Sequence, residues 1–113
     1  MSHLVAVRYD DINNIIAQMR KEGVSERFLG HVIEIKKYND DGLPTRHIVT
    51  TIVGVDILAG PGTRNGVLAH EPAFVVDIIE NGNQVRAFLP DRLNDRPGQW
   101  RVVRLDWPRG LII

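Results

Sequence analysis

Two carboxylates that interrupt apolar stretches are the first candidates for chemistry in this sequence. Glu34 and Asp56 each lie between two branched apolar residues. A carboxylate in such a setting can act as a lone general base, although it more often lies at the rim of an interface. In the hairpin expected around 39–45 the two are about 20 Å apart, whereas the paired carboxylates of glycosidases are less than about 10 Å apart. We therefore expect Glu34 and Asp56 to act separately.

The other residues of catalytic or metal-binding type are scattered. No cysteine occurs, which excludes disulfides, thiolate metal sites and thiol nucleophiles, and neither serine lies in a GxSxG motif. None of the spacings typical of metal sites occurs among the four histidines, which are His3, His31, His47 and His70. We therefore expect no catalytic set, no metal site and no cofactor, and we expect each histidine to have only local partners.

Residues 59–72 form the longest predicted connection, with three glycines and two prolines. Arg64 has glycines on both sides and can hold an anion there, but the segment lacks a GK[ST] sequence and a following helix, which a phosphate-binding loop needs. Long loops in compact domains are often functional. We expect a mobile loop, a lid or an arm that reaches a partner, with Arg64 and His70 as its candidate contacts.

Arginine alternates with tryptophan near the C-terminus, at Arg92, Arg96, Trp100, Arg101, Arg104, Trp107 and Arg109. Such a pattern can bind single-stranded nucleic acid by stacking and phosphate contact. However, the whole chain has 14 Lys and Arg against 14 Asp and Glu, a net charge of zero. Nucleic-acid binders depend on clustered positive charge. Nucleic acid is therefore not the favoured partner, and an RNA-binding or RNA-cleaving toxin-like domain is only a third hypothesis.

Local patterns predict one helix followed by strands. Apolar residues recur at i, i+3, i+4 and i+7 from Ile12 to Met19, behind Asp11 and ahead of Gly23, which predicts a helix over 11–22. Strands are expected over 28–38, 46–58, 74–79, 85–89 and 100–105, with a short edge strand within 4–9. This order predicts a single α+β domain, 1–113. Its N-terminal helix packs on a curved, mainly antiparallel sheet of five or six strands, as a meander, roll or half-barrel.

The turns predict which side chains share a face. A symmetric first turn places Glu34 opposite Thr50, and a two-residue Asn-Gly turn places Asp77 opposite Arg86. One face of the first hairpin then packs on the helix and carries Leu29, Ile33, Ile35, Val49, Val53, Val55 and Ile57. The other face mixes apolar and polar residues, including Phe28, Val32, Glu34, Ile48, Thr50, Ile52 and Asp56.

This mixed face leaves more apolar strand surface than one helix can cover. A helix is about 10 Å wide, whereas five strands about 4.8 Å apart span roughly twice that. The sheet must therefore curl around a cavity, or a second subunit must cover it, and the apolar end at 111–113 adds to this surface. We expect a homodimer. The candidate ligand-binding or interface residues are Phe28, Val32, Glu34, Ile48, Thr50, Ile52, Asp56, Arg64 and His70.

These observations favour a non-catalytic binding or interaction module that self-associates through the mixed face and binds a small apolar ligand or a protein partner. The alternative is a small metal-independent enzyme, an isomerase or hydrolase, with its pocket inside the curled sheet. No apolar run reaches the roughly 18 residues that cross a membrane, and the first residues do not resemble a signal peptide. We therefore expect a cytoplasmic protein without membrane contact.

Overall fold

The computed structural model describes residues 4–8, 11–64, 67–78, 82–90 and 97–108. For residues 57–64 and 67–72 it describes the backbone but not the side chains. These residues form a sheet of six strands, one α-helix and one 3-10 helix. In chain order the elements are β1 (Leu4–Ala6), α1 (Ile12–Met19), η2 (Ser25–Phe28), β2 (Val32–Tyr38), β3 (Pro44–Arg64), β4 (Val67–Ile78), β5 (Asn83–Phe88) and β6 (Trp100–Asp106).

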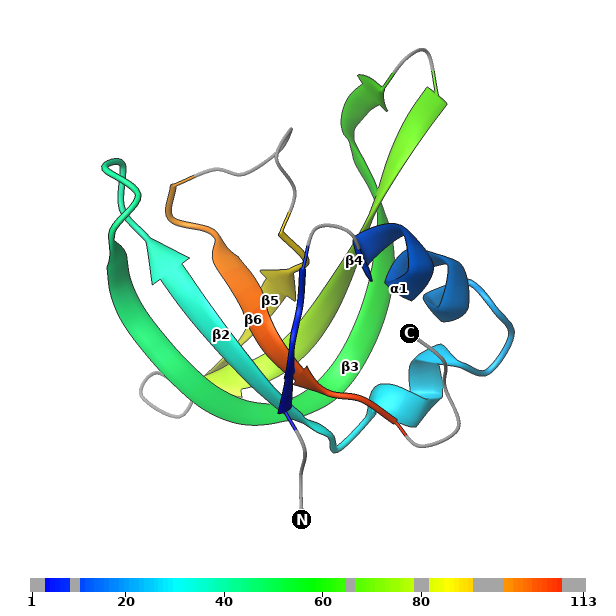
Figure 1. Ribbon diagram of the computed structural model, residues 1–113, viewed down its shortest axis with the longest axis horizontal. Coiled ribbons are helices and arrows are strands. Elements are labelled where there is room, and N and C mark those ends of the chain that lie inside the picture. Colours follow the sequence, from blue (N-terminus) through cyan, green and yellow to red (C-terminus); the bar gives the residue numbers. More distant parts are fainter. Residues whose placement is uncertain (1–3, 9–10, 65–66, 79–81, 91–96, 109–113) are drawn as a thin grey trace.

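The sheet closes into a five-stranded barrel (Figure 1). Strands β2 to β5 form an antiparallel meander, and β6 pairs with β2 on one side and with β5 on the other. The β5–β6 pair is parallel, and β1 is added to β6 outside the barrel. The α+β class and the curled, mainly antiparallel sheet are as predicted. The helix, however, is short and follows β1 in the chain.

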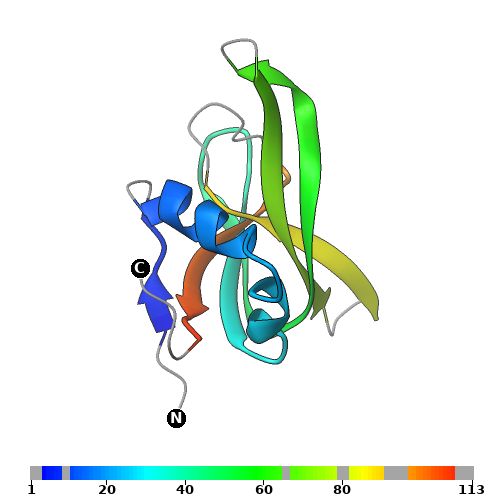
Figure 2. The ribbon, with the colours of Figure 1, turned by 90° about the vertical axis from the view of Figure 1, so that its right-hand side faces the viewer.

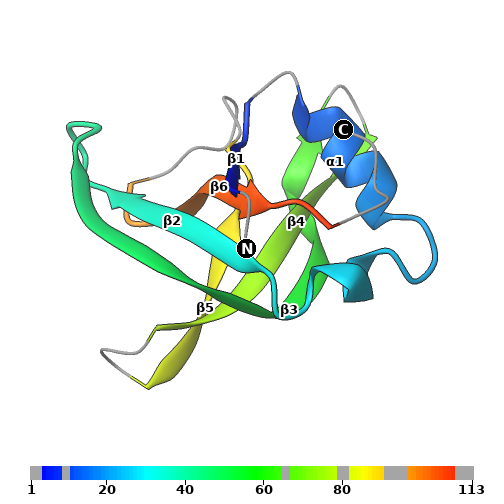
Figure 3. The same cartoon turned by 60° about the horizontal axis from the view of Figure 1, so that its bottom comes forward.

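The helix α1 is shorter than the sequence pattern predicts, ending at Met19 instead of near residue 22. The hydroxyl of Ser25 donates a hydrogen bond of 2.8 Å to the carbonyl oxygen of Met19, which satisfies one of the acceptors left open at the helix end. Gly23 has a φ of 73°, which directs the chain away. The apolar stripe packs as expected, because Ile15 and Met19 are each only 2% exposed. Figure 3 shows α1 on the opposite side of the barrel from the β2–β3 turn.

Apolar side chains fill the barrel and form one core. Phe28, fully buried, contacts Phe74 and Trp107 edge to face, with ring centroids 5.5 and 5.6 Å apart. Phe28 ends η2 and does not lie in a strand as predicted. The core cluster includes Ile15, Phe28 and Ile52 together. The barrel therefore covers the apolar strand face with its own strands. The prediction of a second subunit rested on an apolar face left uncovered, and the described residues show no such face.

The register of the first hairpin differs by one residue from the predicted one. Glu34 lies opposite Val49, not Thr50. The turn is centred one residue earlier than predicted, since Tyr38 pairs with Pro44, and the register then shifts by one residue between Tyr38 and Lys37. Successive side chains alternate between the two faces of a sheet. A slip of one residue therefore places the odd-numbered residues of β3, and not the even-numbered ones, on the same face as Glu34. The predicted mixed face is therefore wrong.

The second hairpin also differs from the prediction. Asp77 lies opposite Gln84, and Arg86 lies opposite Val75. The connection is longer than a two-residue turn, since the paired strands end at Ile78 and begin again at Asn83. Asn81 itself lies outside the described residues.

Residues 59–64 and 67–72 belong to strands and not to the predicted loop. Strands β3 and β4 continue past the barrel as a two-stranded arm, paired as far as Arg64 and Val67 (Figures 1 and 2). The register shifts between Ala59 and Thr63. The Gly-Pro-Gly sequence at 60–62 is thus part of a bulge, a position where strands tolerate these residues.

Neighbouring residues on opposite faces of β3 give a direct test of the register. Ile52 is 1% exposed, whereas Val53 is 41% exposed. We predict that Ile52→Ala lowers the free energy of unfolding by about 2–5 kcal/mol, because it leaves a cavity in the core. Val53→Ala is expected to lower it by less than about 1 kcal/mol. Urea titration measures both, and equal losses would contradict the assignment of the two faces.

Candidate functional site

The outer face of the barrel at β2, β3 and β6 carries the strongest candidate site. Alternation along each strand places these side chains opposite the buried core residues. We define the outer face by residues that share this side of the three strands, namely Val32, Glu34 and Lys36 of β2, His47, Val49, Thr51 and Val53 of β3, and Arg101 and Arg104 of β6.

Glu34 is at the centre of this face and links its three strands. Its side chain is only 12% exposed. Oε1 lies 3.0 Å from Nε2 of His47 on β3, and Oε2 lies 3.6 Å from Nε of Arg104 on β6. The partners are about half exposed, so the cluster presents a nitrogen-rich surface over a mostly buried carboxylate.

A histidine held by a carboxylate is an arrangement that general bases use, because the carboxylate fixes the orientation of the ring. Covalent catalysis also needs a nucleophile within reach of the base. The hydroxyl of Ser25, the one serine in the described part of the chain, donates its hydrogen bond to the carbonyl oxygen of Met19. Within the described part of the chain, no group of three or more metal-ligating side chains occurs.

Cations cover the aromatic rings at the β2–β3 turn end of the barrel. Trp100 is 6% exposed, with Nζ of Lys37 at 5.9 Å and Cζ of Arg46 at 5.4 Å from the ring centroid. On the outer side, Cζ of Arg101 lies 4.9 Å from the centroid of the Tyr38 ring. Such cation–π contacts hold the charged groups in place.

The alternation of Arg and Trp in the sequence is thus partly explained by packing. Trp107 contacts Phe28 in the core, and Trp100 lies beneath Lys37 and Arg46. Arg92, Arg96 and Arg109 lie outside the described residues.

The structure separates most of the residues that the sequence suggested as a site. Phe28 and Ile52 are core residues, and Ile48 packs against the core. The hydroxyl of Thr50 donates to the carbonyl oxygen of Asp77 at 3.1 Å. Of the candidates on the first hairpin, Val32 and Glu34 lie together on the outer face.

The remaining candidates are dispersed along the second half of β3 and on β4. Asp56 forms an exposed ion pair with Arg86, at 3.3 Å. Arg64 and His70 belong to the arm, where only the backbone is described. The two histidines on the first hairpin have separate local partners, as predicted, since His31 lies 3.2 Å from Asp106 and His47 contacts Glu34.

Sequence reasoning missed the outer-face valines of β3, and it did not connect Arg101 and Arg104 of β6 with the first hairpin. Val49 and Val53 were assigned to the inner face by the wrong register, although they are 52% and 41% exposed. The register shift between Lys37 and Tyr38 decides which face these valines occupy, and it lies beside Pro44 at the start of β3.

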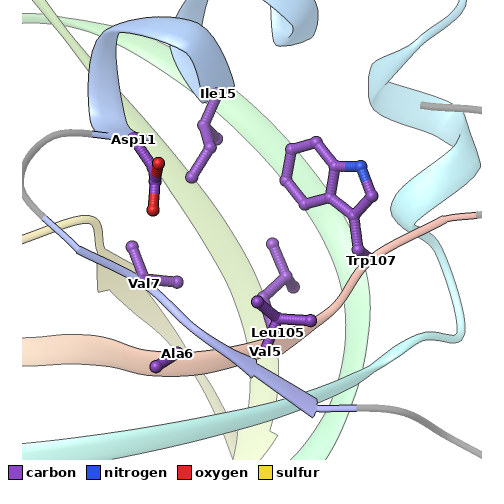
Figure 4. A pocket seen from close by; sticks show the side chains of 7 residues that line it. All are labelled: Val5, Ala6, Val7, Asp11, Ile15, Leu105 and Trp107. Atoms are coloured by element: carbon purple, nitrogen blue, oxygen red, sulfur yellow. The ribbon is translucent and has the colours of Figure 1, made fainter. Parts of the chain in front are cut away.

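A small apolar pocket lies between β1, α1 and the end of β6 (Figure 4). Its lining is apolar except for Asp11, which forms an ion pair with Arg8 at 3.3 Å. The lining residues are Val5, Ala6, Val7, Asp11, Ile15, Leu105 and Trp107. None of the residues proposed from the sequence lines this pocket.

Comparisons with known proteins supply no further assignment. No protein-family model matches the sequence, and no curated protein or solved structure matches it significantly. Within the described residues, no helix has the length and apolar character needed to cross a membrane.

The Glu34 cluster predicts a coupling energy that depends on burial. We expect a double-mutant cycle of Glu34→Gln and Arg104→Gln to give about 1 kcal/mol, because water screens the mostly buried carboxylate poorly. The cycle of Asp56→Asn and Arg86→Gln is the control, since both side chains are about half exposed. It should give about 0.2–0.5 kcal/mol. Urea unfolding measures both coupling energies. Equal values would contradict the claim that burial of Glu34 strengthens its ion pair.

Proposed function

We propose that this protein is a non-catalytic interaction module that binds protein partners through its outer face, including a second copy of itself. The observation that carries this proposal is the exposure of β-branched apolar side chains on β3. Val49 and Val53 are 52% and 41% exposed and lie on one side of the same strand, with Thr51 between them. Adjacent exposed apolar groups of this kind are typical of interaction surfaces.

The composition of the outer face fits a protein interface. Its apolar half, which we define as Val32, Val49, Thr51 and Val53, adjoins charged groups around Glu34. Interfaces combine an apolar centre with a polar rim. In a twofold dimer the same patch of each copy meets the other, so a single apolar patch can serve both subunits.

The packed interior supports surface binding over binding inside the barrel. Large side chains such as Phe28, Phe74 and Ile52 fill it and are at most 1% exposed. We therefore expect a partner to bind on the outside of the barrel. A protein can contact more of that surface than a small apolar ligand can.

Charged substitutions in the apolar half of the outer face test whether the protein is a homodimer. We predict that the wild-type protein is a dimer at tens of micromolar and that the double variant Val49→Lys, Val53→Lys is a monomer, because like charges would then face each other across the interface. Sedimentation velocity measures the mass of both. Leu43→Lys is the matched control, since Leu43 is 61% exposed but lies in the turn beyond the outer face. A wild-type monomer at these concentrations would exclude the homodimer.

A small metal-independent enzyme is the second candidate, and the Glu34–His47 pair favours it. His47 would act as a base whose ring Glu34 orients at 3.0 Å. If so, hydrolysis of p-nitrophenyl acetate should be faster than with free imidazole at equal concentration, and both Glu34→Gln and His47→Gln should slow it. A rate equal to that of free imidazole would exclude this alternative.

A further inference from the structure

We propose that the arm formed by β3 and β4 is a second interaction surface, on which an extended segment of a partner protein adds as a third strand. The segment pairs with β4 over 67–71, along the edge of the strand that faces away from β3. This edge lies outside the outer face, whose last residue on β3 is Val53. Strand addition to the arm can therefore be tested separately from the homodimer.

The edge of β4 that faces away from β3 is paired in the barrel and unpaired in the arm. In the barrel this edge pairs with β5, and the pairing begins at Ala73. Between 67 and 72, β4 still pairs with β3, but no described residue pairs with its other edge. Every second residue of an antiparallel strand directs both its N–H and its C=O to the same edge. The edge over 67–71 therefore presents a row of donors and acceptors to a further strand.

The arm is a kind of structure that a third strand stabilises. Figures 1 and 2 show that its two strands continue well past the barrel. A ribbon of two strands is only marginally stable in water, whereas three strands form a more stable sheet. The complement of an open strand edge is another extended polypeptide, because its backbone repeats donors and acceptors at the same spacing. This chemistry favours a protein segment over a nucleic acid or a lipid.

The two edges of the arm differ in how well they can accept a strand. The β3 edge contains Gly-Pro-Gly at 60–62, where the register shifts between Ala59 and Thr63. Proline has no N–H to donate, and a bulge bends the strand, so both features protect an edge against pairing. The β4 edge reads Val-Leu-Ala-His-Glu over 67–71, with neither proline nor glycine. We therefore assign the added strand to β4.

The sequence of the β4 edge indicates which side chains the partner segment carries. The edge is apolar at 67–69, and Glu71 is the one acidic residue of the arm. The other charged residue of the arm, Arg64, lies at the far end of β3. At the base of the arm, Asp56 forms an ion pair with Arg86 at 3.3 Å. The complementary segment is therefore apolar, lacks proline and has a lysine or arginine opposite Glu71, since opposite charges on paired strands attract.

A second copy of the arm matches this edge less well than such a segment does. Two copies of 67–71 that pair about a twofold axis are centred on Ala69. That register places Val67 opposite Glu71 of the second copy and Leu68 opposite its His70, and each mismatch occurs twice. A segment with a basic residue opposite Glu71 gains an ion pair at the same position.

The probe is a fluorescein-labelled peptide with the core Lys-Thr-Val-Ile-Val between two serines. Antiparallel addition places its lysine opposite Glu71 and its last three core residues opposite 67–69. Fluorescence anisotropy with the whole chain measures the affinity, and we expect a Kd of about 100 μM or below. A wild-type protein that is folded and does not bind this peptide would overturn strand addition.

Two methylated peptides test whether the backbone is what the arm recognises. One carries N-methyl groups on the lysine and both valines of the core, and the other on the threonine and the isoleucine. Each therefore loses its backbone donors along one edge only. We expect one of the two peptides to lose binding and the other to keep it. Equal binding or equal loss would show that the peptide does not add as a strand.

An exchange of charges tests whether the peptide lies beside β4. We expect Glu71→Lys to weaken binding of the peptide about fivefold, and a peptide with Glu in place of Lys to restore it. The matched control is Glu22→Lys, which makes the same change in net charge at an exposed position after α1 and should bind within about twofold of wild type. Circular dichroism checks folding, and Glu71→Gln, with an expected loss of about twofold, replaces a variant that does not fold. Equal effects of the substitutions at Glu71 and Glu22 would overturn the assignment to β4.

Sedimentation velocity separates strand addition from self-association. A dimer that persists in the Val49→Lys, Val53→Lys variant and is lost in Ala69→Pro would assign the β4 edge to a second copy and overturn the partner segment. A monomer that binds the peptide would refute only the homodimer of the outer face. A dimer that does not bind the peptide would refute only strand addition to the arm.

Discussion

The double pairing of β6 is the constraint on which the rest of this structure depends. The strand hydrogen-bonds to β2 in antiparallel and to β5 in parallel direction, and so joins the two ends of the meander. Closure removes the open edges that a sheet would otherwise expose. It also turns the inner faces of all five barrel strands toward one another. The apolar core is thus covered by strands, and a short helix is enough to complete it with Ile15 and Met19.

Closure also creates the candidate site. Glu34 on β2 reaches a histidine from the strand that follows it and an arginine from the last strand of the chain. The two partners are separated by more than fifty residues in sequence, yet both flank one carboxylate. The outer face is therefore a product of the tertiary fold, and no short motif in the sequence describes it.

Several features were nevertheless predictable from local patterns. The apolar spacing from Ile12 to Met19 indicated the helix, and alternation indicated the strands. The surplus of apolar strand surface left two alternatives, a curled sheet or a second subunit, and the sheet curls. These predictions depend on periods of a few residues, which hold whatever the tertiary contacts are.

The register and the arm were not predictable in the same way. The turn at 39–43 looks symmetric in sequence, but Asn39 accepts hydrogen bonds from the backbone of Asp41 and Leu43, and the register shifts beside it. The glycines and proline at 60–62 resemble a loop, although strand pairing continues on both sides of them. No short turn connects β5 with β6, which pair in parallel. Alternation predicts that each segment is a strand, but it does not predict which strands pair.

The alternation of faces along β2 and β3 has a consequence for how this protein can change. Ile33, Ile35 and Ile52 are buried, while the side chains between them face outward. Substitutions on the outward set do not change the side chains that fill the core, so the outer surface can change in sequence while the barrel is preserved. Insertion or deletion of a single residue in the turn is different, because it would turn valines inward and isoleucines outward along a whole strand at once. The fold therefore restricts the length of the turn between β2 and β3 more tightly than the identity of any residue on the outer surface.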